Sequence, residues 1–299
     1  MPAVEDFVAF YAARDWDRLG AVFSPSGFER IGQYGDVIDS SQGYIDFLRR
    51  VVPTLKEGYE LKPVHIAYGG DTVIAELIER LSGSDYRRFI RERVLDQLGL
   101  ERFRLGVPVA DQGDINRLEV RGEPPTNAEL EVLLGIPGIT LEALQGEVTE
   151  AALLAFDEPD VRTIGVPGGG GISTAADIAL FYQALLRNPG ELWDPAVLAS
   201  GTREVHGTLP DPIWTVSSNR ALGTVIAGDQ PGALQRGFGH TLSPRAFGHA
   251  GAGGQLAFAD PDSGVSFCYL TNGLDANTIR QGRRGASIAN YAGRLADSR

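Results

Sequence analysis

The order of hydrophobic and polar residues predicts a first segment of helices and strands. Apolar residues recur at helical spacing in residues 4–11 and again in 42–54. Asp15 is a suitable N-cap for a short helix that follows it. Two strands, joined by a glycine-rich turn, are expected over residues 59–67 and 72–76.

The middle of the chain is predicted to begin with a helix and to continue as loops. An amphipathic stripe predicts one helix and its exit over residues 84–105, with Gly99 ending the helix. Prolines then interrupt residues 106–170, where only 142–156 shows a weak helical pattern. We therefore expect this stretch to consist mainly of loops.

The last part of the chain predicts a helix, an antiparallel hairpin and a final helix. Glycines 168–171 lead into a helix over 174–186, which begins with Thr and Asp at capping-box spacing. Apolar residues alternate in 245–272 on both sides of a turn at 260–264. The final helix is expected over residues 285–295.

Composition narrows the class of protein. The chain has 299 residues, of which 43% are apolar, which suggests about two domains or one large one. Its net charge of -12 argues against a nucleic-acid partner, and the lack of a long apolar run argues against a membrane span. The acidic start does not resemble a secretory signal. Cys268 is the one cysteine, so no intrachain disulfide can form, which fits a reducing compartment. We therefore expect a cytoplasmic protein.

The residues offer little support for a metal or cofactor. The sequence contains no His-Glu-x-x-His motif and no cluster of Cys and His, so no metal is expected. The glycines at 168–171 could cradle a phosphate, but a P-loop would add Lys followed by Ser or Thr at the helix start. We interpret this run as a tight turn that packs a helix, and we expect no cofactor.

The first part of the chain resembles the SnoaL-like group of the nuclear-transport-factor-like superfamily. The matching stretches are FYAARDWDRLGAVF (10–23), GQYGDVIDSSQGYIDFLRR (32–50) and YGGDTVIAE (68–76). The resemblance implies an α+β cone around a ligand pocket, although the later strands of that group do not follow residue 76.

Within the SnoaL-like stretch, three residues are candidates for binding a small molecule. Related cyclases and isomerases use a pocket Asp or His as a base, and the resemblance therefore points to Tyr34, Asp36 and His65. A turn at Asp36 and a structural role for His65 are the alternatives.

Most of the remaining chain resembles the C-terminal part of class C β-lactamases and related serine esterases. The matching stretches are ELIERLSGSDYRRFIRERVLDQLGL (76–100), VPGGGGISTAADIALFYQALL (166–186) and FGHAGAGGQLAFADPDSGVSFCYLTNGLD (247–275). The third stretch resembles the strand of that family in which His-x-Gly replaces Lys-Thr-Gly. By this resemblance His249 would line the pocket, Gly251 would allow close approach of a substrate, and the N–H of Ala252 would form half of an oxyanion hole.

The other two motifs of the family are absent from this sequence. A serine three residues before a lysine is required, but Pro53 precedes Lys56 and Tyr59 precedes Lys62, the two lysines of the chain. None of the nine tyrosines is followed two residues later by Asn or Ser.

Other serines, cysteine and histidines offer weak alternatives as reacting groups. We expect Ser173 to begin a helix, and Cys268 to be a small buried hydrophobe. His206 and His240 lack an obvious partner and are expected in loops or at the surface. Arginines 280, 283 and 284 are expected to form the solvated approach to a helix.

Together these observations predict an α+β protein in two parts. Residues 1–78 would be a truncated SnoaL-like segment, and 79–299 a partial β-lactamase/transpeptidase-like domain of helices and antiparallel sheet. The predicted function is that of a serine hydrolase by descent whose catalysis is impaired. The alternatives are a small-molecule-binding module and a non-catalytic protein that acts by association. Unpaired sheet edges in both parts would favour self-association.

Overall fold

In the computed structural model, the chain separates into two compact units, residues 1–72 and 73–299. The structure describes the following residues: 2–23, 30–31, 37–38, 40–54, 78–145, 149–210 and 216–296. The boundary between 78 and 79 and the SnoaL-like assignment remain predictions from the sequence. None of the helices in these ranges is long and apolar enough to cross a bilayer.

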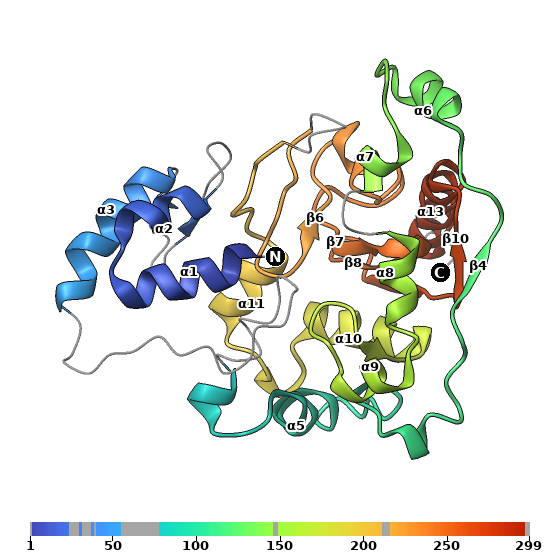
Figure 1. Cartoon of the computed structure of the whole chain (residues 1–299). Coiled ribbons are helices and arrows are strands. Elements are labelled where there is room, and N and C mark those ends of the chain that lie inside the picture. The colour runs from blue at the N-terminus through green and yellow to red at the C-terminus, as the bar shows by residue number, and fades with distance from the viewer. Residues whose placement is uncertain are drawn as a thin grey trace. The chain divides into compact units, whose positions relative to one another are not determined.

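The described residues of the first unit form three helices (Figure 1), which pack around a small aromatic core. They are α1 (Pro2–Ala13), α2 (Trp16–Val22) and α3 (Ser41–Val51), which a 3₁₀ turn, η1 (Val52–Thr54), extends. Strands β1 (Arg30–Ile31) and β2 (Val37–Ile38) pair antiparallel. Asp15 caps α2 by accepting a hydrogen bond from the Arg18 N–H. The three predicted helices and the Asp15 cap are thus confirmed, whereas the strands expected over 59–67 and 72–76 lie outside the described residues.

An antiparallel sheet of four strands forms the centre of the second unit. Its order is β6-β7-β8-β9. The strands are β6 (Val225–Ile226), β7 (Phe247–Gly251), β8 (Gln255–Asp260) and β9 (Val265–Tyr269). Asp260 caps the turn between β8 and β9 by accepting hydrogen bonds from the hydroxyls of Ser243 and Ser263. The hairpin predicted from residues 245–272 is confirmed.

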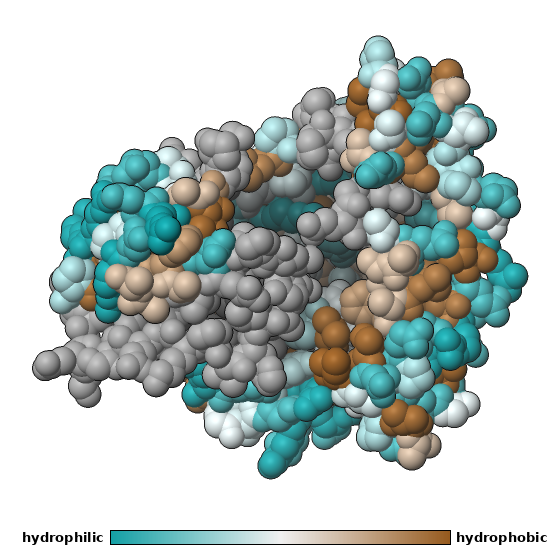
Figure 2. Space-filling view, in the orientation of Figure 1, coloured by the Kyte–Doolittle hydropathy of each residue, from teal (hydrophilic) through white to brown (hydrophobic). Residues whose placement is uncertain are grey.

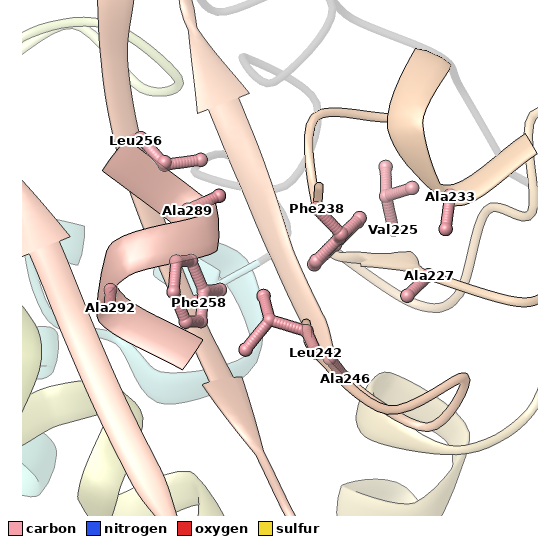
Figure 3. Packing of buried hydrophobic residues seen from close by; sticks show 10 residues of the cluster. All are labelled: Val225, Ala227, Ala233, Phe238, Leu242, Ala246, Leu256, Phe258, Ala289 and Ala292. Carbon is pink, nitrogen blue, oxygen red and sulfur yellow. The ribbon is translucent and has the colours of Figure 1, made fainter. Parts of the chain in front are cut away.

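The sheet buries both of its faces because successive side chains along each strand point to opposite faces and apolar residues occur on both. Phe258 and Leu256 point to the face covered by α13 (Thr278–Gly293), where they pack with Ala289 and Ala292 (Figure 3). Phe247, on the opposite face, packs against α10 (Ala175–Arg187) and the ring of Tyr182. The small residues of α13 allow it to approach the sheet closely.

Helices and short strands surround this sheet. The helices are α5 (Tyr86–Ile90), α6 (Asn127–Leu134), α7 (Leu141–Gln145), α8 (Glu150–Ala155), α9 (Pro159–Ile164), α11 (Pro195–Thr202) and α12 (Gly232–Gln235). Short single turns are η3 (Val109–Asp111), η4 (Pro189–Glu191), η5 (Ala252–Gly254) and η6 (Arg294–Ala296). Strand β3 (Arg104–Leu105) pairs antiparallel with β5 (Gly171–Ile172), and β4 (Glu119–Arg121) pairs parallel with β10 (Gly273–Asp275).

Two secondary-structure predictions were wrong in part. The single helix expected over 84–105 is α5 followed by a π-helical turn, η2 (Arg91–Leu95). It ends at Leu95, four residues before Gly99, which has a left-handed conformation in the turn that follows. The wider turn brings Leu95 into the interior, where it is 2% exposed. Residues 142–156 form two helices rather than one, α7 and α8.

The loop-rich stretch also contains helices that the sequence analysis missed. Thr126 and Glu129 form a reciprocal capping box that begins α6, and Gly135 ends it in a left-handed conformation. The final helix begins at Thr278, seven residues before the predicted start, because Asn277 caps it. Local capping therefore formed helices where the apolar periodicity was too short to show them.

Candidate functional site

A pocket of about 680 Å³ lies in the second unit, between the glycine-rich turn, α8 and the segment after β9. Its apolar lining includes Phe103, Leu118, Leu153, Phe156, Ile172 and Leu274. Its polar lining includes Arg102, Arg104, Asn116, Ser173, Thr271 and Asn272. Hydrophobic side chains also gather on the molecular surface around α8 (Figure 2). Such a mixture of an apolar wall and a few polar groups suits a small organic ligand.

The glycine-rich turn forms one wall of this pocket. A Cβ at Gly169 would lie 2.6 Å from the Phe156 ring, and a Cβ at Gly170 would lie 2.4 Å from the backbone nitrogen of Val166. Glycine is therefore required for the turn to fold this tightly. The turn leads through β5 to Thr174, whose hydroxyl caps α10. This geometry agrees with the tight, helix-packing turn expected from the sequence.

The cap of α10 differs in one detail from the expected capping box. The Asp177 N–H donates to the Thr174 hydroxyl, as predicted, but the Asp177 carboxylate accepts from the backbone N–H of Arg102. This second bond ties α10 to the segment that precedes β3, which lines the same pocket.

A buried ion network forms part of the pocket wall. The side chains of Asp157 and Arg162 are both 5% exposed and form an ion pair. Asp157 also accepts from Arg117 at 2.5 Å and from the Leu118 N–H at 3.0 Å. Because three donors bind this carboxylate, it is a structural anchor of the pocket wall.

The third motif lies on β7 and at its end. Ala252 lines the pocket, and the role of its N–H in an oxyanion hole stays a prediction. Gly251 allows Gln255 to lie close, since a Cβ there would be 2.9 Å from the Cβ of Gln255. His249, however, is not among the residues that line the pocket, because its ring is held by two hydrogen bonds elsewhere.

The two hydrogen bonds define the tautomer of His249. Arg220 Nη1 lies 2.8 Å from Nε2, and the carbonyl oxygen of Ala250 lies 2.6 Å from Nδ1. Since Arg220 can only donate, Nε2 is the acceptor and Nδ1–H the donor of a neutral ring. Partial desolvation lowers the pKa of His249, and the charge of Arg220 lowers it further. The lone pair on Nε2 that could accept a proton therefore already accepts a hydrogen bond from Arg220.

Among the described residues, no serine near the pocket has a base beside it. The hydroxyl of Ser173 donates to the carbonyl of Thr174 at 3.3 Å and has no other bond in the part of the chain that the structure describes. Ser266 and Cys268 alternate with residues that pack toward α13. Cys268 is buried, and burial raises the pKa of its thiol to about 12. The expectation that Cys268 is buried is confirmed.

The structure does pair one serine with a histidine, at a place that the sequence did not indicate. The Ser200 hydroxyl lies 2.7 Å from Nε2 of His206, so the expectation that His206 has no obvious partner was wrong. The chain turns back after α11, which brings these residues together. Glu204 approaches the same nitrogen at 3.9 Å, so it does not orient the ring through Nδ1. The pair also sits at the C-terminal end of a helix, which disfavours an oxyanion.

Several sequence candidates cannot be placed. Tyr34, Asp36 and His65 lie outside the described residues, so their role in ligand binding stays a prediction. The backbone N–H of His240 donates to Asn290, and its side chain is at the surface, as expected. Among the described residues no group of three His, Cys, Asp or Glu side chains is arranged to hold a metal ion.

The sheet, with α13 on one face and α10 on the other, defines an α+β fold of the β-lactamase/transpeptidase type. EstA from Arthrobacter nitroguajacolicus has this fold with a TM-score of 0.53 and 20% identity, over 78% of this chain and 63% of its own. A penicillin-binding protein homologue from Caulobacter crescentus has a TM-score of 0.51 and 22% identity, over 78% of this chain and 62% of its own.

The family follows from the sequence match. The model of the Beta-lactamase family matches residues 65–290, and the chain belongs to this family of serine hydrolases. It is 28% identical over 222 residues to the esterase/beta-lactamase LipL of Mycobacterium tuberculosis, a match that covers 68% of this chain and 46% of LipL. The chain thus spans about half the length of this curated relative.

Proposed function

We propose that this chain derives from acyl-serine hydrolases that cleave esters or amides and that its own hydrolytic step is impaired. The observation that carries the proposal is the absence of Ser-x-x-Lys and of Tyr-x-Asn or Tyr-x-Ser from all 299 residues. Without the paired serine and lysine, no hydroxyl is activated for attack on a carbonyl.

The geometry of the remaining motif supports this proposal. Ala252 still lines a pocket that could admit a small ester, but the nucleophile whose N–H would complete the oxyanion hole is missing. His249 is neutral, and its acceptor nitrogen is bound to Arg220. The pocket can therefore hold a ligand without supplying a nucleophile and base for covalent chemistry.

Labelling with a fluorophosphonate probe tests the proposal. The folded protein, checked by circular dichroism, is treated with the probe, and its intact mass is measured before peptide mapping. We expect no labelled serine. Stoichiometric labelling of one serine would overturn the proposal and identify the nucleophile.

A second assay tests two serines as possible nucleophiles, one that contacts a histidine and one that lines the pocket. Hydrolysis of a p-nitrophenyl ester is compared between the wild type, Ser173→Ala and Ser200→Ala. Ser200 is included because of its contact with His206, and Ser173 because it lines the pocket. We expect the same low rate in all three proteins. A rate that falls in one variant would assign catalysis to that serine.

A second candidate function is that the protein acts by associating with another protein chain. The outer edge of the four-stranded sheet favours this candidate. Strand β9 lies at the end of the four-stranded sheet and has no neighbour on its outer side among the described residues. The outward-facing N–H and C=O groups of this five-residue edge strand can pair with a strand from another chain. Light scattering across a range of concentrations tests this, since self-association through the edge predicts a mass that rises with concentration. A constant monomer mass would exclude it.

A small-molecule site in residues 1–78 is the remaining alternative. The aromatic core of the first unit supports it, with Trp16 partly buried against Tyr11 at a ring distance of 5.8 Å. An apolar ligand bound there would quench tryptophan fluorescence saturably in the wild type but not in Trp16→Phe. Equal quenching in both proteins would argue against this site.

A further inference from the structure

A second pocket, of about 900 Å³, lies between α6 and the first turns of α13 and shares no lining residue with the pocket described above. One wall is apolar and comes from α6, where Val132 is 87% exposed and Leu133 is 43% exposed. Leu130 of the same helix is buried, so α6 packs through one side and leaves a second apolar side without cover among the described residues. Ile279 of α13 extends this apolar surface.

The opposite wall carries three arginines. The guanidinium of Arg280 binds both carboxylate oxygens of Asp275, at 2.9 and 2.6 Å, and Arg284 binds one of them at 2.7 Å. Asp275 therefore holds two of the cations in place but neutralises only one positive charge. Arg283 makes no side-chain hydrogen bond or ion pair with the described residues and lines the pocket.

The acidic residue of this pocket does not neutralise the arginines. Glu129 directs one carboxylate oxygen to its own helix start, where it accepts from the N–H and the hydroxyl of Thr126. Counting the three arginines, Asp275 and Glu129 together, the pocket has a net charge of +1 in a chain whose net charge is -12. An exposed, unpaired guanidinium beside an apolar wall is complementary to an anion with a hydrocarbon tail.

From this juxtaposition we infer that the α6–α13 pocket binds a linear aliphatic carboxylate. The carboxylate is bound by Arg283, with Arg280 beside it, and the alkyl chain lies along Val132, Leu133 and Ile279. The volume is in the range of small-molecule sites, which favours a single amphiphile over a protein segment. The inference is independent of any hydrolytic activity of the chain.

Calorimetric titration of the full chain with sodium decanoate tests this inference. We expect saturable binding that weakens at high salt, because the arginines are at the surface. Octanoate is expected to bind about fourfold more weakly, since two fewer methylene groups are partly buried. Decyltrimethylammonium, which has the same tail and the opposite charge, is expected to show no saturable binding.

Matched variants locate the site. Arg283→Gln is expected to weaken decanoate binding by about fivefold, whereas Arg187→Gln, which removes an exposed arginine from α10, leaves it unchanged. Val132→Ser is expected to weaken binding by about twofold, whereas Val197→Ser, at another exposed valine, has no effect. Absence of decanoate binding, equal effects of Arg283→Gln and Arg187→Gln, or equal binding of the cationic amphiphile would each overturn the inference.

Discussion

Replacing Asp275 by Asn tests how strongly the ion network at the end of β10 stabilises the second unit. The Asp275 side chain is 5% exposed and accepts hydrogen bonds from Arg280, Arg284 and the N–H of Asn277. Asparagine has nearly the same shape and can still accept from the backbone N–H. The substitution therefore removes the charge with little change in packing.

The magnitude follows from the pKa of this carboxyl. The hydrogen bond from Arg280, followed by those from Asn277 and Arg284, lowers the pKa of Asp275 from 3.8 to about 2. A change of this size corresponds to about 2.4 kcal/mol, and solvent screening at Arg280, which is half exposed, reduces it to about 1.5 kcal/mol. We expect Asp275→Asn to lower the free energy of unfolding by this amount at pH 7.

The pH dependence has a definite sign. Because the folded-state pKa lies below the unfolded value, the stabilisation is fully present well above pH 3.8 and is lost as the pH falls through 2. Near pH 3 about half of it should remain.

Urea unfolding followed by circular dichroism, at pH 7, 5 and 3, measures this difference between the wild type and Asp275→Asn. Asp262→Asn serves as the control, since it removes one partner of an exposed pair with Arg245 and should cost less than about 0.5 kcal/mol. A loss of stability in Asp275→Asn that is the same at pH 7 and pH 3, or no larger than in the control, would refute the reasoning.

Three further predictions concern the sheet. Phe258→Ala removes a ring that is 0% exposed and is expected to lower the free energy of unfolding by about 4 kcal/mol in urea denaturation. Gly248→Ala would place a Cβ 2.2 Å from the carbonyl oxygen of Ala257 and is expected to destabilise the protein by about 3 kcal/mol, seen as a lower melting temperature; an unchanged melting temperature would contradict the strand packing. Cys268 should react with a thiol reagent at pH 8 only after unfolding, because its pKa of about 12 and its burial suppress the thiolate; rapid labelling of the folded protein would show that the thiol is accessible.

Local sequence patterns predicted an element correctly where a short segment contains its own turn, cap or alternation of apolar residues. The alternation of apolar residues on both sides of the turn at 260–264 predicted the β8–β9 hairpin, because side chains in a strand repeat every two residues. Asp15 and Thr174 marked the starts of α2 and α10, since a cap acts within one helical turn. The same patterns missed α6, although its capping box was visible in the order Thr, Asn, Ala and Glu.

The sequence by itself also determined which motifs of the family are absent. Motifs such as Ser-x-x-Lys are defined by spacing along the chain, so their absence needs no coordinates. Only the tertiary structure decided the contacts between residues that are far apart in sequence. Arg220 occupies the acceptor nitrogen of His249, 29 positions away, and Asp177 binds the backbone of Arg102, 75 positions away. These contacts form because the fold brings separate elements together, and the local periodicity of the sequence cannot predict them.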